Sequence, residues 1–211
     1  GLTAQEPALF EEGRTAFVAP LLPSEGAGPV FNELTCAGCH NVPAIGGFGA
    51  RRVTRFGVAA TSTSPFQALE GLGGTLLQDQ SFTIGCRESV PAQATHTALR
   101  GTPILFGAGL IESIPDATLV TRANNQPAGL VGRVHTTVPI ETPSGARRIG
   151  RFGWKGGIAT VDSFSLDAAL NEMGLTSQFL PQENAPNGDL ALLAQCDTVA
   201  DPEDMPDAAG F

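Results

Sequence analysis

The sequence predicts a mainly α-helical domain that is enlarged by long irregular loops and a few short strands. Apolar residues recur with helical spacing near both ends of the chain. The 26 glycines and 16 prolines form about a fifth of the 211 residues, which indicates long ordered connections but not disorder. A chain of this length favours one domain. We place this domain at residues 1–196 and an acidic tail or the start of a linker at residues 197–211.

The N-terminal half combines two expected helices with loops. One helix is expected over 4–18 and another over about 28–40, and their apolar stripes consist of Leu9, Phe10 and Phe17, and of Val30, Phe31 and Leu34. A glycine-rich loop then leads to a short strand at about 52–58. Residues 59–97 have weak patterns that are typical of an irregular insert.

The C-terminal half begins with Pro103–Ile114, which is apolar and is expected to be buried. Asp116 then favours the start of a short helix that runs to about Ala123. A hairpin is expected over 130–153. The last helix is expected to start at a cap, Ser163 or Ser165, and to end at a terminal glycine, Gly174, with an apolar stripe of Leu166, Ala169, Leu170 and Met173.

The charge balance excludes some classes of function. The chain has 12 basic and 21 acidic residues and a formal charge of −9, which argues against nucleic-acid binding. No apolar run approaches the roughly 20 residues that span a bilayer. Lys155 is the only lysine, and arginine suits carboxylate partners because its donors form a planar fork. Two arginine clusters therefore suit either carboxylate groups of a ligand or a solvated surface: Arg51, Arg52 and Arg55, and Arg147, Arg148 and Arg151.

The segment Cys36-Ala-Gly-Cys39-His40 carries the spacing of a c-type haem attachment site. Residues three apart share one side of a helical turn, so both thiols can reach the two vinyl groups of a haem. The imidazole of His40 can then bind the iron. A redox Cys-x-x-Cys pair and a zinc site are the alternatives, but neither a βαβ context nor a second ligand pair is evident. We therefore expect one covalent haem c in a cytochrome-c-like domain.

The expected haem indicates a compartment. Haem is attached to such motifs outside the cytoplasm, so we expect a periplasmic or exported protein. The chain begins at Gly1, and we expect that a leader was removed or that the sequence was cut from a longer one. In an oxidising compartment Cys86 and Cys196 can form a disulfide, although two separately buried thiols are the alternative. Closing such a long loop stabilises a fold by roughly 4 to 5 kcal/mol in chain-entropy models.

The sequence around this motif resembles the di-haem oxidoreductase family, also described as thiol oxidoreductases, which is distantly related to bacterial di-haem cytochrome c peroxidases. The similar segments cover most of the chain: Gly1–Phe17, Gly28–Gly47, Gly107–Asp116, Gly150–Lys155 and Asn171–Thr176. Members of that family carry a second Cys-x-x-Cys-His motif in a C-terminal haem domain, which this sequence lacks. The resemblance therefore implies a single-haem fragment of such a protein or a shortened relative.

The second axial ligand of the iron decides between functions, since methionine suits electron transfer and an open position permits peroxide chemistry. Met173 is our first candidate and His96 the alternative, and either a vacant position or another ligand stays open. His135 reads as a surface histidine and Met205 lies in the acidic tail. Trp154 is expected to pack near the macrocycle.

These observations predict single-electron transfer to a redox partner protein or to a second haem domain, with Arg51 and Arg52 beside the haem carboxylates. The alternative is a peroxidase-like haem oxidoreductase with an open or displaceable distal position. Whether the chain is itself an enzyme stays open at this point, and electron transfer is the preferred reading.

Overall fold

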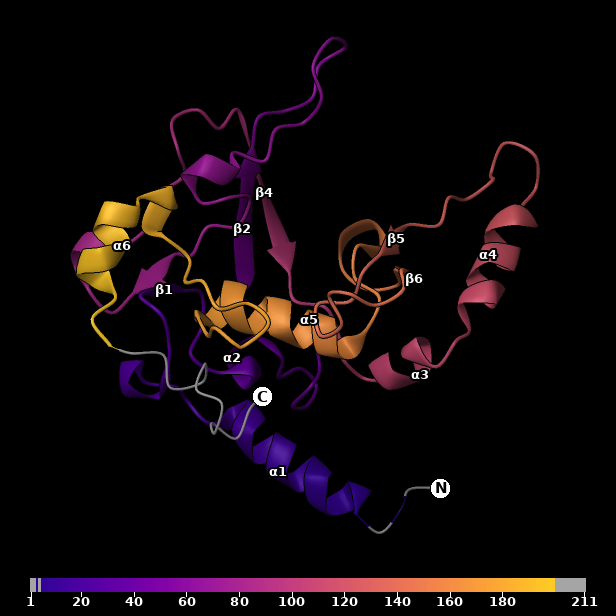
Figure 1. Ribbon diagram of the computed structural model, residues 1–211, viewed down its shortest axis with the longest axis horizontal. Coiled ribbons are helices and arrows are strands. Elements are labelled where there is room, and N and C mark those ends of the chain that lie inside the picture. Colours follow the sequence, from indigo (N-terminus) through magenta and orange to yellow (C-terminus); the bar gives the residue numbers. More distant parts are fainter. Residues whose placement is uncertain (1–2, 4, 200–211) are drawn as a thin grey trace. The chain divides into compact units, whose positions relative to one another are not determined.

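The longest sheet in the described residues pairs two six-residue antiparallel strands, β2 (Arg52–Gly57) and β4 (His96–Gly101). The computed structural model describes Thr3 and residues 5–199. The chain divides into unit 1, which comprises residues 1–105 and 169–211, and unit 2, which comprises residues 106–168. Figure 1 labels the helices and strands of both units. The strand expected at 52–58 is therefore confirmed within one residue.

The prediction of a mainly α-helical, cytochrome-c-like fold is wrong. Helices hold 34% of the described residues and strands 15%, which makes the fold mixed and rich in loops. Several predicted helical or irregular segments are instead two-stranded sheets or single helical turns. The short 3-10 turns are η1 (Pro23–Glu25), η2 (Glu70–Leu72), η3 (Ile84–Cys86), η4 (Trp154–Gly156) and η6 (Pro186–Gly188).

The helix expected over 28–40 is replaced by a strand, a bend and one helical turn. Strand β1 (Val30–Phe31) pairs with β3 (Gln80–Ser81), and both residues of β1 are buried. Only α2 (Cys36–Cys39) is helical. The β-branched and aromatic side chains of Val30 and Phe31 suit a buried strand as well as a helix, because a short apolar run does not distinguish the two.

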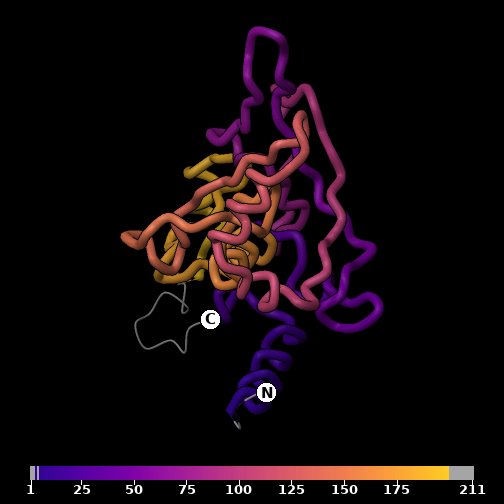
Figure 2. Tube along the Cα trace, turned by 90° about the vertical axis from the view of Figure 1, so that its right-hand side faces the viewer, coloured from indigo at the N-terminus to yellow at the C-terminus, as the bar shows by residue number. Residues whose placement is uncertain are grey.

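The N-terminal helix α1 (Glu6–Val18) is present nearly as predicted, but it buries no residue. Leu9 is 68% and Phe10 66% exposed, so only the C-terminal end of the apolar stripe makes a contact with α2. That contact joins the ring of Phe17 to the ring of His40. The rest of α1 extends away from α2, as the ribbon and the tube both show (Figures 1 and 2).

Unit 2 contains three helices, α3 (Ala108–Glu112), α4 (Asp116–Asn124) and α5 (Val161–Ala168), and a hairpin of β5 (Thr136–Thr137) and β6 (Arg148–Ile149). The short helix from Asp116 and the hairpin over 130–153 are thus confirmed. Pro103–Ile114 is not buried, however, since Leu110 is 77% exposed. The helix α5 begins one turn earlier than expected: the Thr160 hydroxyl accepts a hydrogen bond from Ser163 N (3.1 Å), so Thr160, not Ser163 or Ser165, caps the helix.

After α5 the chain continues in unit 1 as a π-helical turn, η5 (Ala169–Met173). This turn is followed by Gly174. Gly174 has a φ of +70°, the left-handed conformation expected of a terminal glycine. A Cβ atom at Gly174 would lie 2.8 Å from both the N and the Cα atom of Gly28. The two glycines therefore permit η5 to lie directly against the segment that leads into β1.

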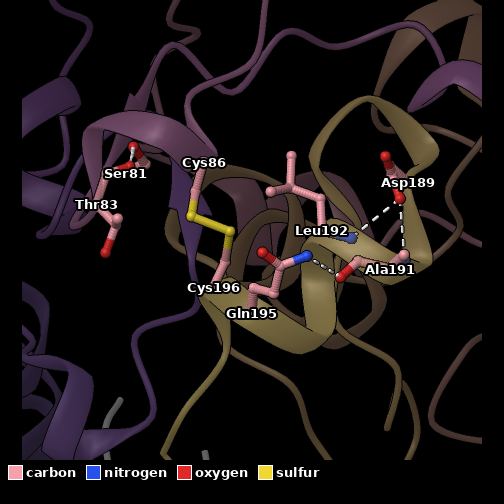
Figure 3. Close-up of a disulfide and its surroundings, with 8 residues drawn as sticks. All are labelled: Ser81, Thr83, Cys86, Asp189, Ala191, Leu192, Gln195 and Cys196. Atoms are coloured by element: carbon pink, nitrogen blue, oxygen red, sulfur yellow. Dashed lines mark hydrogen bonds between the residues drawn. A yellow bond between two sulfur atoms is a disulfide. The ribbon is translucent and has the colours of Figure 1, made fainter.

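The last helix of the described chain, α6 (Leu190–Cys196), is attached to η3 by a disulfide between Cys86 and Cys196 (Figure 3). The Asp189 carboxylate caps this helix by accepting hydrogen bonds from Ala191 N (2.9 Å) and Leu192 N (3.0 Å). The Cα atoms of the two cysteines are 5.9 Å apart, and 110 positions separate them in the sequence. The expected tail at 197–211 lies outside the described residues from position 200 onwards.

No helix among the described residues is both long enough and apolar enough to cross a membrane. This agrees with the sequence, which has no apolar run of the required length.

Removing the disulfide should lower the free energy of unfolding by about 4 to 5 kcal/mol, because a closed loop of 110 residues restricts the unfolded chain. The measurement is urea unfolding of the wild type and of the double variant Cys86→Ser, Cys196→Ser, each with and without a reductant. The free energy of unfolding of the double variant should be the same with and without the reductant. A wild type that is equally stable in both conditions would contradict this expectation.

Replacing Gly174 by Ala should destabilise the protein by about 2 kcal/mol or more, because the new Cβ meets Gly28 and the left-handed backbone disfavours it. Gly13→Ala is the matched control, since Gly13 lies in α1 with no atom within 4 Å of the added Cβ. That change should stabilise by about 0.5 to 1 kcal/mol. Thermal unfolding of both variants tests the pair, and equal effects at the two positions would refute the close packing of η5.

Candidate functional site

The turn α2 presents Cys36 and Cys39 from one side of a short helix. The Thr35 hydroxyl accepts a hydrogen bond from Gly38 N (2.8 Å), and His40 N donates to Cys36 O (2.9 Å). These bonds close a single turn, on which residues three apart lie on the same side. The two thiols are not bonded to each other. The motif therefore forms one helical turn with two free thiols, even though the longer helix expected around it is absent.

His40 follows this turn and is held by the loop of residues 41–48. Its Nδ1 lies 3.0 Å from the carbonyl oxygen of Gly47. A Cβ at Gly47 would come within 1.9 Å of the Val42 carbonyl oxygen, so this return of the loop requires glycine. When Nδ1–H donates to the carbonyl, Nε2 keeps its lone pair, which is the arrangement found in histidines that bind metals.

The protonation of His40 also suits a ligand role. Burial lowers the pKa of His40 below its ordinary value, and the carbonyl groups of Gly47 and Pro103 oppose this effect only in part. The neutral form of the imidazole, which is the form that binds metals, is thus favoured at neutral pH.

Met173 lies beside the motif although it is 137 positions away from Cys36. Its sulfur is 3.7 Å from the sulfur of Cys36, and its side chain is buried. Met173 is the last residue of the π-helical turn η5, and such turns are frequent at functional sites. The structure therefore brings Cys36 and the preferred methionine ligand together from two segments of unit 1 that are far apart in the sequence.

Of the other candidate ligands, His96 lies away from the motif. The C-terminal end of β4 lies near Cys39, because Thr102, the residue after Gly101, hydrogen bonds through its hydroxyl to the Cys39 thiol. His96 lies at the other end of β4, about 17 Å along the strand. His135 belongs to unit 2, where its Nδ1 lies 3.2 Å from Gly156 O. Met205 lies outside the described residues.

The arginines expected to bind the haem carboxylates lie on different sides of the chain, because successive side chains along a strand point in opposite directions. Arg51 and Arg55 share one side of the strand and are half-buried, whereas Arg52 points to the other side and is exposed. The Nε atoms of Arg51 and Arg55 are buried and make no hydrogen bond. Arg51 also pairs with Asp79 at 2.7 Å. Buried, unsatisfied guanidinium donors fit a ligand that carries carboxylates, so Arg51 and Arg55 suit this role better than Arg52.

Two further candidate residues, Trp154 and Arg151, belong to unit 2. Trp154 is 61% exposed on the turn η4, and this turn contains Lys155 in the left-handed conformation. The Arg151 side chain is only 3% exposed and pairs with Asp116, while it also donates to the carbonyl oxygens of Glu112, Ile114 and Ile149. Arg151 is thus used within unit 2, whereas the packing of Trp154 near the macrocycle stays a prediction.

The two alternatives to haem attachment find little support. Burial is the largest influence on Cys39 and raises its pKa to about 11; the carboxylates of Glu172 and Glu33 add to this, while Arg51 opposes it. Burial raises the pKa of Cys36 as well. Redox-active cysteines instead have lowered pKa values. Among residue 3 and residues 5–199, no three His, Cys, Asp or Glu side chains are grouped as a metal site, so a zinc site has no ligand set there.

In haem-free protein, alkylation of Cys39 by iodoacetamide should be roughly a hundredfold slower at pH 7.5 than in an unstructured peptide, because only the thiolate reacts. The rate should rise about tenfold per pH unit until the pH approaches 11, the pKa of Cys39. Mass spectrometry of the digested protein follows each cysteine separately, and the urea-unfolded chain is the control. A rate that levels off near pH 7 would instead indicate an activated redox thiol.

Comparison with known proteins adds no relative: no family model, no curated protein and no solved structure matches the chain. The resemblance to the di-haem oxidoreductase family therefore stays a prediction from the sequence. The case for a function depends on the arrangement of Cys36, Cys39, His40 and Met173.

Proposed function

We propose that the chain is a c-type haem domain that transfers single electrons, with His40 and Met173 as the axial ligands. The observation that carries this proposal is the 3.7 Å contact between the sulfur atoms of Met173 and Cys36. Met173 lies beside the attachment motif, and Met205, the other methionine of the sequence, lies outside the described residues. A thioether ligand is typical of electron-transfer cytochromes.

The cysteines supply the attachment. Each thiol would hold the haem through a thioether bond, with its sulfur on one carbon of a vinyl group and its hydrogen on the other, so attachment would need no oxidant and no leaving group. The raised pKa values of both thiols keep them protonated and intact before this addition. The bound haem supplies the one-electron couple of its iron.

The remaining residues hold the group and set its surroundings. The Gly47 carbonyl orients His40, and the ring of Phe17 packs against the same imidazole with centroids 6.2 Å apart. Arg51 and Arg55 offer their buried guanidinium donors to the haem carboxylates. Burial of Met173 keeps water away from the ligand and favours a stable bond, which supports electron transfer over peroxide chemistry.

The disulfide and the attached haem both belong to an oxidising compartment, so the proposal includes a periplasmic or exported location. It also includes a partner that exchanges electrons with the haem, either a separate redox protein or a second haem domain.

Optical spectra of the haem-loaded protein test the proposal. The wild type should be low-spin, show the weak far-red band of a methionine–iron bond and stay unchanged when carbon monoxide is added to the reduced form. Met173→Ala should lose that band, bind carbon monoxide and have a lower reduction potential, because methionine ligation raises the potential. The alkaline pyridine spectrum should report two thioether bonds, and Cys36→Ala should reduce them to one.

His96→Ala and Met205→Leu are the matched controls, since each removes another candidate ligand. Both variants should keep the wild-type spectrum. If the wild type were high-spin or bound carbon monoxide readily, the methionine assignment would fail and the peroxidase-like alternative would become the preferred reading.

A further inference from the structure

Asn32 is the most completely buried polar side chain near the attachment motif. It is 1% exposed and follows strand β1, four residues before Cys36. Its Nδ2 donates to the Glu172 carboxylate at 2.8 Å, and its Oδ1 accepts from Asp79 N at 3.2 Å. The amide side chain thus connects three segments that are distant in sequence.

The main chain at this position binds the same partner. The backbone N–H groups of Asn32 and Glu33 both donate to the carbonyl oxygen of Glu172, at 2.8 and 3.1 Å. Glu172 is therefore held by its carbonyl and by its carboxylate from one short segment, and Met173 is the next residue. The position of the Met173 backbone follows from these three hydrogen bonds.

The strength of this arrangement comes from its burial and its charge. A hydrogen bond from an amide to a carboxylate is stronger than one between neutral groups, and the low polarity around a buried pair strengthens it further. The haem motif lies on the same segment, since residues 32–36 lead directly from β1 to α2. One short segment thereby fixes both the first thiol and the residue that precedes the methionine.

The geometry points to Asn32 as the positioning residue for Met173: its contacts with Glu172 hold the methionine sulfur at the attachment motif, and so control whether the iron keeps this ligand. The inference rests on the proposed function, because it assumes that Met173 binds the iron. The Asn32 side chain hydrogen bonds to Glu172 and Asp79, and not to the proposed iron ligands His40 and Met173.

The test is Asn32→Asp in the haem-loaded protein. The variant keeps the oxygen that accepts from Asp79 N but sets a second carboxylate against Glu172. The far-red methionine–iron band should fall to less than about half, the reduction potential should fall, and carbon monoxide should bind about tenfold faster. Hydrogen exchange should also increase locally, over residues 169–176.

The rescue variant combines Asn32→Asp with Glu172→Gln. The amide of the new glutamine then donates to the new aspartate, so the hydrogen bond returns with donor and acceptor exchanged. The far-red band and the slow carbon monoxide reaction should both recover. Glu172→Gln alone should have a small effect, because its side-chain oxygen can still accept from Asn32.

Asn187→Ala is the control for a general loss of stability. The Asn187 side chain makes two hydrogen bonds, from Ser89 N (3.0 Å) and to Ser89 O (2.8 Å), and neither of them involves η5. This variant should be less stable yet keep the far-red band. The inference is overturned if Asn32→Asp keeps the band, or if Asn187→Ala loses it equally.

If the proposed function itself is wrong, the spectra differ from those that would refute only the role of Asn32. In that case the wild type itself lacks the far-red band, and the inference falls together with the ligand assignment. A wild-type band that persists in Asn32→Asp leaves the proposed function intact and removes only the role of Asn32.

Discussion

The close approach of Gly28 to Gly174 is the constraint on which the rest of unit 1 depends. Any side chain at either glycine would overlap the backbone of the other segment. The contact lets η5 lie against β1, and it places the main-chain donors of Asn32 and Glu33 within reach of the Glu172 carbonyl. Without this approach Met173 would have no reason to lie at a motif that is 137 positions away in the sequence.

Buried polar groups then fix what the glycines permit. The buried side chain of Gln78 donates from Nε2 to Asn171 O (3.1 Å), and its backbone N–H donates to the Glu88 carboxylate (2.7 Å). Glu88 also accepts from Asn187 N (2.8 Å), and burial raises its pKa despite both bonds. Buried polar groups with satisfied partners specify a unique packing, because an altered arrangement leaves donors unpaired. The apolar core of the unit is small, so this specificity comes largely from amides and carboxylates.

The sequence predicted local features of this chain better than its architecture. The strand from Arg52, the helix from Asp116 and the terminal glycine Gly174 follow from short-range patterns, and the pairing of Cys86 with Cys196 follows from the cysteine count. The class of fold could not be predicted in this way. Val30 and Phe31 satisfy a helical stripe and a buried strand equally well, and only their pairing with β3 decides between them. The role inferred for Asn32 was also beyond reach, since it depends on a contact across 140 positions.

Arginine illustrates why residue type alone does not identify a site. Both clusters suit carboxylates by composition, but the structure uses them differently. In unit 2, Arg151 satisfies its donors with Asp116 and three carbonyl oxygens, and so joins two segments that the sequence resemblance had singled out. In unit 1, Arg51 and Arg55 each keep a buried Nε without a protein partner. A guanidinium group that is already saturated has nothing left to offer a ligand, whereas a desolvated and incomplete one is more stable when a carboxylate completes it. Arg51 and Arg55, not Arg151, are therefore the arginines with a chemical reason to bind the carboxylates of the proposed haem.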